Sequence, residues 1–281
     1  MTPQGFGALV GSAALFSLAL ACERGESPTA LAPSRGATAV RTNTNSADVR
    51  AAEGPEGGGC TNASLEGAYG FLRTGGTSAG PLAAEGLVTY DGSGTWVTTA
   101  TISQHGTYTF DAQSTGTYAV DPDCTGKVLS NGQEVGLFDL VDGGNVVLVL
   151  SEVAGDAISE VQKRVGLRSC SNADFEGAFG FVRTGTTPAG PLAAVGIGVD
   201  DGAGNIVGGR QLTSRNGVFT STTVGGTYAV GADCQGKFFM PNGQEFGRFV
   251  LVEHGNEVLQ ISESPGTTVT GDEHRLNRQS R

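Results

Sequence analysis

The strongest constraint on the fold of this chain is an internal repeat. The segment 60–75 (CTNASLEGAYGFLRTG) matches 170–185 (CSNADFEGAFGFVRTG), and 116–124 (GTYAVDPDC) matches 226–234 (GTYAVGADC). Both matches are 110 residues apart (170 − 60 and 234 − 124). A long match at a fixed period indicates duplication of a whole structural unit. The chain is therefore expected to fold as two copies of one domain.

Each copy alternates short β-rich runs with turn signals, and no run shows the apolar spacing of a helix. Asn131-Gly132 and its counterpart Asn242-Gly243, 111 residues later, are typical of two-residue hairpin turns. Consecutive hairpins make an antiparallel meander, and closing it into a barrel removes exposed edges. The predicted fold is all-β, with two tandem antiparallel up-and-down β-barrels of about eight strands each; β-sandwiches are the alternative. In the first copy the pattern predicts strands near 67–74, 83–90, 95–110, 114–121, 125–130, 134–141, 145–151 and 157–164.

The repeated cysteines bear on the number of strands. Segment 104–106 could be a bulge in one long strand or a turn that makes nine strands. In an eight-strand meander the first strand begins, and the fourth ends, at the same end of the barrel, so Cys60 and Cys124 can approach to disulfide distance. Nine strands would separate them. The sequence therefore predicts eight strands and the disulfides Cys60–Cys124 and Cys170–Cys234, as in proteins of oxidising compartments.

The beginning of the chain has the composition of a targeting segment. The run 6–21 is apolar but short for a transmembrane helix, and is typical of a signal-peptide core. It ends in Ala19-Leu20-Ala21-Cys22, which resembles the lipobox of bacterial lipoproteins and implies lipidation of Cys22. Ordinary cleavage after Ala21, which would leave a free thiol, is the alternative. The expected organisation is a signal peptide with lipobox (1–22), a disordered tether (23–59), barrels at 60–166 and 167–276, and a tail (277–281).

Composition excludes one class of partner. The formal net charge is −11, and no basic patch offsets it. Nucleic-acid phosphates would be repelled by such a surface. We therefore expect no nucleic-acid partner.

The repeat also resembles known sequences. Segments of the type C-x-N-A-x-[LF]-x-G-x-[YF]-G-F, followed by G-T-Y-x-V-x-x-D-C, resemble a tandem repeat of secreted bacterial proteins of uncharacterised function. At the level of fold the pattern is similar to small calycin-like and allene-oxide-cyclase-like barrels. Calycins open with Gly-x-Trp and end with an arginine that crosses the tryptophan ring. Here Tyr69 and Phe179 replace the tryptophan, and Arg164 and Arg275 lie in the last strands. Such folds host many activities, so the resemblance implies no particular one.

Four repeated polar residues are candidates for ligand binding: Arg73, Arg183, Tyr118 and Tyr228. An arginine at a barrel mouth can hold a ligand carboxylate through two hydrogen bonds. The alternative is that Arg73 pairs with a repeated acid, Glu66 or Glu134, or caps the barrel. The tyrosines are most simply residues of the barrel wall.

No residue pattern indicates a catalytic, metal or cofactor site. The histidines His105, His254 and His274 do not correspond between the copies, and no third ligand accompanies either cysteine pair. The expected function is that of an exported, lipid-anchored, non-enzymatic binding or structural module that faces the periplasm or the cell surface and holds a small apolar ligand. A soluble secreted form is the alternative location. A cyclase or isomerase that uses Arg73 and Glu66 is the alternative function.

Overall fold

The computed structural model describes residues 59–276. The predicted signal peptide, Cys22, nearly all of the predicted tether and the predicted tail lie outside the described residues. Among the described residues no helix is long and apolar enough to cross a membrane. The two repeats belong to one compact unit.

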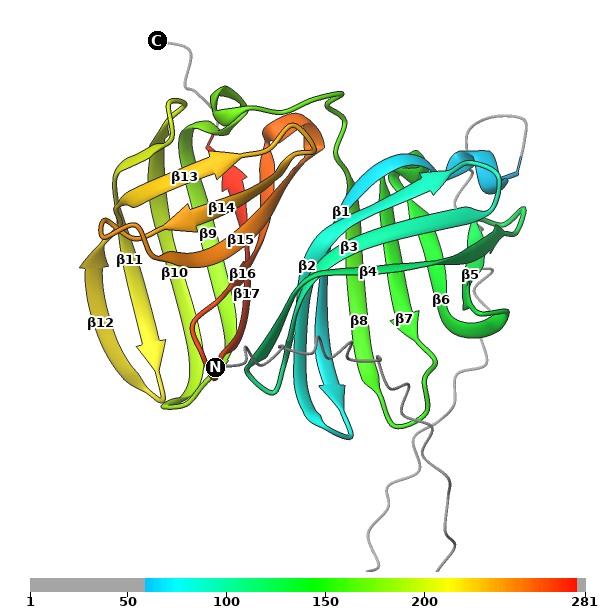
Figure 1. Ribbon diagram of the computed structural model, residues 1–281, viewed down its shortest axis with the longest axis horizontal. Coiled ribbons are helices and arrows are strands. Elements are labelled where there is room, and N and C mark those ends of the chain that lie inside the picture. Colours follow the sequence, from blue (N-terminus) through cyan, green and yellow to red (C-terminus); the bar gives the residue numbers. More distant parts are fainter. Residues whose placement is uncertain (1–58, 277–281) are drawn as a thin grey trace, which may run out of the picture. The chain divides into compact units, whose positions relative to one another are not determined.

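The first repeat is a closed antiparallel barrel of eight strands (Figure 1). Each strand pairs with the next, and the last strand pairs with the first, so the sheet has no free edge. This confirms the predicted all-β barrel. The strands are β1 (Glu66–Thr77), β2 (Gly80–Asp91), β3 (Thr95–Gln104), β4 (Thr107–Val120), β5 (Thr125–Ser130), β6 (Gln133–Val141), β7 (Val146–Ser151) and β8 (Ala157–Arg164).

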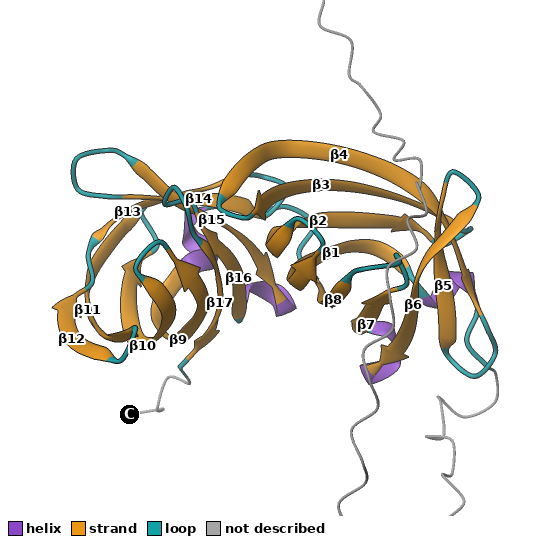
Figure 2. Ribbon diagram, turned by 90° about the horizontal axis from the view of Figure 1, so that it is seen from below, coloured by secondary structure: helices purple, strands orange, loops and turns teal. Residues whose placement is uncertain are grey.

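The second repeat also closes into an eight-strand ring, with one additional strand. The ring runs β9-β10-β11-β13-β14-β15-β16-β17, and β12 pairs with β11 beside β13, so that β12 and β13 together take the place of β4. Figure 2 shows that both repeats consist almost entirely of strands, with short helical turns only. The strands are β9 (Glu176–Thr187), β10 (Gly190–Asp201), β11 (Asn205–Arg215), β12 (Val218–Thr223), β13 (Gly226–Val230), β14 (Gln235–Phe239), β15 (Glu245–Val252), β16 (Glu257–Ser262) and β17 (Thr268–Arg275).

One predicted boundary is wrong, although the strand count is right. The predicted strand 95–110 is divided by a turn at His105-Gly106, where both residues have positive φ. The predicted break before residue 114 is absent, because β4 continues through it with a register shift opposite Ala100–Ile102. One extra turn and one missing break cancel, which leaves eight strands.

A short 3-10 turn lies at one end of each barrel and is held by the repeated tyrosine. In the first barrel the turn η1 (Asn62–Ser64) precedes β1, and the Tyr118 hydroxyl donates to the Leu65 carbonyl at 2.8 Å. The Asn62 side chain accepts from the backbone N–H of Val120 at 2.9 Å. In the second barrel Tyr228 donates to the Phe175 carbonyl in the same way, at 3.0 Å. The tyrosines are therefore structural residues of this end.

In each barrel the end with the 3-10 turn also carries the predicted disulfide, and both disulfides are confirmed. Cys60–Cys124 and Cys170–Cys234 each have a Cα–Cα distance of 4.9 Å and a sequence separation of 64 residues. Each ties the segment before the first strand of its barrel to the turn after the strand that carries the tyrosine. The pairing indicates that the chain matures in an oxidising compartment.

The two barrels contact one another through their outer faces. The Lys163 ammonium lies 2.5 Å from a Glu257 carboxylate oxygen, and Arg248 Nη1 lies 2.6 Å from Asp111. The Tyr108 hydroxyl donates to the Ser262 carbonyl at 2.6 Å. These contacts join strands of the first barrel to β15, β16 and the segment that follows.

Removal of the first disulfide should destabilise the first barrel. For a loop of this length the chain-entropy model gives about 4 kcal/mol for the Cys60→Ser/Cys124→Ser variant. Trp96 is the only tryptophan and lies in β3, so its fluorescence during urea unfolding reports the first barrel. The variant Cys170→Ser/Cys234→Ser is the matched control and should shift this transition far less. An unchanged midpoint after loss of Cys60–Cys124 would contradict a stabilising role.

Candidate functional site

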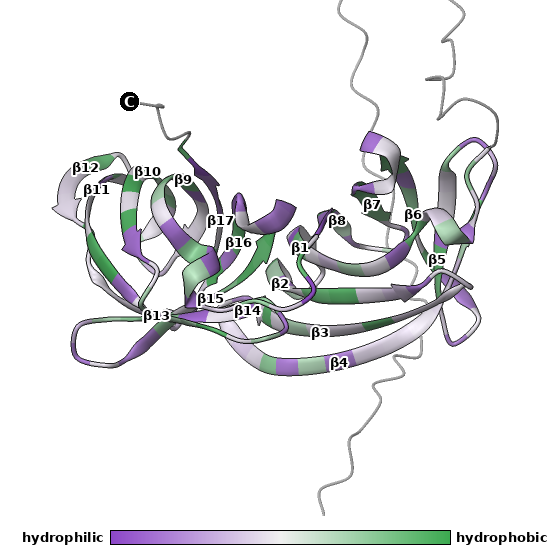
Figure 3. Ribbon diagram, turned by 90° about the horizontal axis from the view of Figure 1, so that it is seen from above, coloured by the Kyte–Doolittle hydropathy of each residue, from purple (hydrophilic) through white to green (hydrophobic). Residues whose placement is uncertain are grey.

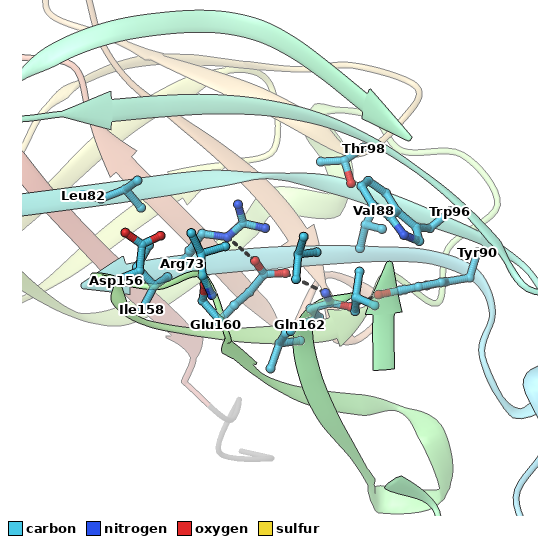
Figure 4. A pocket seen from close by; sticks show the side chains of 16 residues that line it. Arg73, Leu82, Val88, Tyr90, Trp96, Thr98, Asp156, Ile158, Glu160 and Gln162 are labelled. Atoms are coloured by element: carbon cyan, nitrogen blue, oxygen red, sulfur yellow. Dashed lines mark hydrogen bonds and ion pairs between the residues drawn. The ribbon is translucent and has the colours of Figure 1, made fainter. Parts of the chain in front are cut away.

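The first barrel contains a cavity of about 270 Å³. This volume lies just below the roughly 300–1,000 Å³ typical of small-molecule sites. Figure 4 shows side chains from several strands converging on it. Nine of the sixteen lining residues are apolar or glycine, and seven carry polar side chains. The lining residues are Arg73, Leu82, Val88, Tyr90, Trp96, Thr98, Val128, Val135, Gly136, Val149, Ser151, Val153, Asp156, Ile158, Glu160 and Gln162.

The alternation of strand β8 places polar groups inside the barrel. Ile158, Glu160 and Gln162 are buried, whereas the residues between them are more exposed. Successive side chains of a strand point to opposite faces, so these three share the inner face. An acid and an amide two residues apart thereby enter an otherwise apolar interior.

Four of the polar side chains form one hydrogen-bonded chain (Figure 4). The Tyr90 hydroxyl donates to Gln162 Oε1 at 2.9 Å, and Gln162 Nε2 donates to Glu160 Oε1 at 2.6 Å. The other Glu160 oxygen accepts from Arg73 Nε at 2.5 Å. Every member of this chain has a partner, which is what makes burial of the Glu160 carboxylate tolerable.

Burial sets the protonation state of Tyr90, at one end of this series of hydrogen bonds. The pKa of Tyr90 is raised, first by desolvation and then by the Glu160 carboxylate. Tyr90 is therefore neutral at physiological pH and acts as a hydrogen-bond donor to Gln162.

Among these four hydrogen-bonded side chains, Arg73 is the one that reaches solvent. Its side chain is 42% exposed, whereas that of Glu160 is 5% exposed. Only Nε makes a hydrogen bond among the described residues, and the guanidinium lies 5.5 Å from the centroid of the Phe71 ring. The two outer nitrogens of the guanidinium therefore retain donors for a ligand oxygen.

The partner of Arg73 differs from both acids that the sequence suggested. Glu66 is exposed, and Glu134 forms an ion pair with Lys127 at 3.5 Å. Arg73 pairs instead with Glu160, which lies directly opposite it across the β1–β8 pairing. Sequence reasoning missed Glu160, Gln162 and the position of Trp96 in the lining. The sequence of 157–164 (AISEVQKR) has no polar–apolar alternation that could have placed these polar residues inside.

The candidate tyrosines do not belong to this cavity lining. Tyr118 and Tyr228 donate to backbone carbonyls at the disulfide end, as described above. Of the four candidate ligand-binding residues, the structure thus places Arg73 in the cavity and both tyrosines in a structural role.

The second barrel has a different interior at the matching positions. Arg183 Nη2 contacts Glu273 at 3.4 Å, and Glu273 also accepts from Gln260 at 2.6 Å. At the 110-residue offset Asp200 replaces Tyr90, and at the 111-residue offset Gly271 replaces Glu160. The repeat therefore keeps the arginine but changes its surroundings.

Asp200 lies in this interior as a second buried carboxyl. It is 4% exposed, and burial raises its pKa to about 8, with a further increase from Glu273. Asp200 is therefore largely protonated at neutral pH.

The calycin-like pairing of an arginine with the first-strand aromatic ring occurs in both barrels. The Arg164 guanidinium lies 4.7 Å from the centroid of the Tyr69 ring, and Arg275 lies 4.7 Å from that of Phe179. Arg164 also donates to the Gly144 carbonyl, beside the Tyr69 hydroxyl that donates to the same oxygen. These arginines stabilise the barrel end.

One acidic cluster lies on the outside of the second barrel. Glu257, Asp272 and His274 bring ligand atoms within 4.8 Å of one another. The Lys163 ammonium already neutralises Glu257 at 2.5 Å. The cluster is explained by this ion pair between the barrels.

The raised pKa of Asp200 should make the second barrel less stable as pH rises. A carboxyl with a folded-state pKa near 8 and an unfolded-state pKa near 3.8 stabilises the fold fully below pH 4. That contribution is lost as pH rises to 8. The Asp200→Asn variant mimics the protonated form and should gain on the order of 2 kcal/mol over the parent at pH 8.5, with little difference at pH 4. Urea unfolding followed by circular dichroism at both pH values measures this.

The neighbouring Asp201 is the matched control with the opposite sign. Hydrogen bonds from Asn205 lower its pKa, so Asp201→Asn should destabilise the fold above pH 4. If the stability of the two variants depended on pH in the same way, the opposite pKa shifts of Asp200 and Asp201 would be contradicted.

Comparison with known proteins gives only distant structural likenesses. No protein-family model and no curated protein matches the chain. One solved structure is a protein of unknown function of the DUF3598 family from Nostoc punctiforme PCC 73102, with 11% identity, coverage of 76% of this chain and 97% of that chain, and a TM-score of 0.25. Another is kievitone hydratase from Nectria haematococca, with 8% identity, coverage of 75% and 89%, and a TM-score of 0.24. Scores this low support no inference about the activity of this chain.

Proposed function

We propose that this protein is an exported binding protein whose first barrel holds one small amphipathic molecule. The apolar body of the ligand lies against Val88, Trp96 and Val149, and a carboxylate or carbonyl head accepts hydrogen bonds from Arg73. The observation that carries this proposal is the apolar cavity with an arginine whose outer nitrogens have no partner among the described residues. Mostly apolar walls with a few convergent polar groups are typical of such sites.

The outer donors of Arg73 favour a head with one accepting oxygen, and the two acids of the lining, Glu160 and Asp156, disfavour a head with further negative charge. Glu160 already neutralises one side of the Arg73 guanidinium. What remains is a directional pair of N–H donors beside apolar walls. Such a site selects a ligand with one accepting head and an apolar remainder.

A cyclase or isomerase reaction through Arg73 and Glu66 is less well supported. Glu66 is exposed and so cannot act together with Arg73 inside the cavity. The acid that does contact Arg73 is held by two hydrogen-bond donors. This arrangement favours fixed orientation of Arg73 over proton transfer.

The location of the protein is part of the proposal. Export is supported by the two disulfides and by the apolar run 6–21. Anchoring through a lipid on Cys22 rests on the resemblance of 19–22 to a lipobox. The segment 23–59 is long enough to hold the barrels away from a membrane.

Ligand binding can be measured through Trp96, the only tryptophan of the chain and a residue of the cavity lining. Octanoate should change its emission saturably, and 1-octanol should do so with lower affinity. The Arg73→Met/Glu160→Gln variant should bind octanoate at least about tenfold more weakly, because a hydrogen bond to a charged group contributes about 1.5–3 kcal/mol. Its affinity for 1-octanol should be nearly unchanged. Removing both charges together avoids leaving Glu160 buried without a partner.

The variant Arg183→Met is the matched control, since it makes the same change in the second barrel. It should leave the Trp96 titration unchanged. The proposal fails if neither probe gives a saturable signal, or if Arg183→Met weakens octanoate binding as much as the double variant does.

Lipidation can be tested separately from binding. In a bacterial host that processes lipoproteins, the chain should incorporate labelled palmitate and partition with membranes, and Cys22→Ser should abolish both. Cys170→Ser/Cys234→Ser is the control for cysteine loss and should retain the label. A label-free parent chain, recovered as a soluble exported protein, would refute lipidation while leaving the binding proposal intact.

A further inference from the structure

The contact between the barrels uses two different faces. The outer face of β1–β2 in the first barrel packs on the outer face of β15–β16 in the second. Ala68, Leu72 and Leu87 contact the hydrophobic cluster that includes Val250 and Leu259. Val250 and Leu259 are 0% and 3% exposed. The interface is therefore apolar at its centre and joins unlike surfaces of two similar domains.

The packing at this interface is close enough to require a glycine. A Cβ on Gly70 would lie 2.5 Å from Val252 Cγ1 and 2.6 Å from Val250 Cγ1. The backbone of β1 thus lies directly against the Val250 and Val252 side chains at that point. Such complementarity is typical of a specific interface.

Because the chain is a duplication, each barrel carries both faces. We call the outer face of β1–β2, and its counterpart on β9–β10, the front face. We call the outer face of β6–β7, and its counterpart on β15–β16, the back face. The contact inside the chain uses the front face of the first barrel and the back face of the second. The front face of the second barrel and the back face of the first remain unused.

The unused front face is apolar and exposed. Val182, Val195 and Ile197 are 39%, 51% and 45% exposed, and Val195 lies opposite Val182 in the β9–β10 register. They occupy the positions of Leu72, Glu85 and Leu87 at the 110-residue offset. Figure 3 shows apolar residues recurring along β10 and β11.

The unused back face exposes three leucines grouped around one acid, Asp139, which lies directly opposite Leu148. Leu137, Leu148 and Leu150 are 44%, 43% and 57% exposed, and Leu137 lies opposite Leu150 in the β6–β7 register. At the 111-residue offset they occupy the positions of Arg248, Leu259 and Ile261, of which Leu259 and Ile261 are buried in the second barrel. Contiguous apolar patches of this kind mark interaction sites.

The charged residues at this interface differ between the copies on both sides. At the used interface Glu85 is buried, and this burial raises its pKa to about 8, a rise that the nearby Arg248 opposes. Their counterparts on the unused faces are Val195 and Leu137. An acid–base combination is thus replaced by two apolar residues, one on each face. The Lys163–Glu257 ion pair is replaced by His274 and Val146, and the central Val250 is replaced by Asp139. Contact between the unused faces would therefore be apolar around one carboxylate.

We propose that copies of this chain associate head to tail, the front face on β9–β10 of one copy packing on the back face on β6–β7 of the next. The contact repeats the one between the two barrels of a single chain. Because the two faces differ, the association is heterologous, and it grows into a ring or a filament instead of stopping at a symmetric dimer.

The test uses one substitution on each face, Ile197→Arg for the front face and Leu148→Arg for the back face. Every sample is the full chain with Cys22→Ser, so that a lipid cannot drive association. In analytical ultracentrifugation the parent should form species larger than a dimer as concentration rises. Each Arg variant alone should be monomeric, since every contact needs both faces. Equimolar mixing of the two variants should restore a 1:1 dimer and nothing larger.

This complementation distinguishes head-to-tail contact from other modes of association. The proposal is overturned if the parent stays monomeric, which includes the case of its own residues 1–58 covering a face. It is also overturned if either variant alone still associates, or if the mixture stays monomeric. Circular dichroism checks folding, and Ile197→Thr and Leu148→Thr, milder changes suited to a strand, should weaken association in the same pattern.

Discussion

The pairing of the last strand with the first is the constraint on which the rest of each barrel depends. In the first barrel this β1–β8 seam sets Arg73 directly opposite Glu160. That register creates the ion pair, orients the arginine and leaves its outer nitrogens free to bind an oxygen. In the second barrel the matching seam sets Arg183 opposite Gly271. The acid comes from Glu273, two residues further along the same inner face, so the same closure supports different chemistry.

Much of the fold follows from sequence, because its determinants are local or repeated. The duplication fixes two domains, the turn residues fix an antiparallel meander, and the cysteine pair Cys60–Cys124 fixes the number of strands. The error at 95–110 arose because the cysteine pair allows eight strands, and a turn at His105-Gly106 together with the expected break before residue 114 would have made nine. The Arg73–Glu160 contact could not be predicted. It joins residues 87 positions apart, and its register depends on every intervening hairpin.

Divergence between the copies has affected the inside and the outside of the barrels in different ways. The disulfide end is retained in detail, including the Tyr118 and Tyr228 bonds and the arginines that stack on Tyr69 and Phe179. In the adjoining interior the hydrogen-bonded Tyr90 and Gln162 of the first barrel are replaced by two carboxyl residues, Asp200 and Glu273. A retained disulfide end with a changed interior is expected if the two barrels bind different ligands, or if only one of them binds a ligand.

The outer faces obey a constraint that a single domain does not have. A duplicated domain whose copies meet through unlike faces leaves one face of each kind unused, and both must then be polar or be covered. Here both expose apolar side chains, with Asp139 as the acid of the back face, and Glu85 and Arg248 have apolar counterparts in Val195 and Leu137. The net charge of −11 opposes the approach of copies at long range, and salt screens that repulsion within about 10 Å at 0.1 M ionic strength. Growth of a head-to-tail assembly would thus be limited by overall charge and driven by these faces.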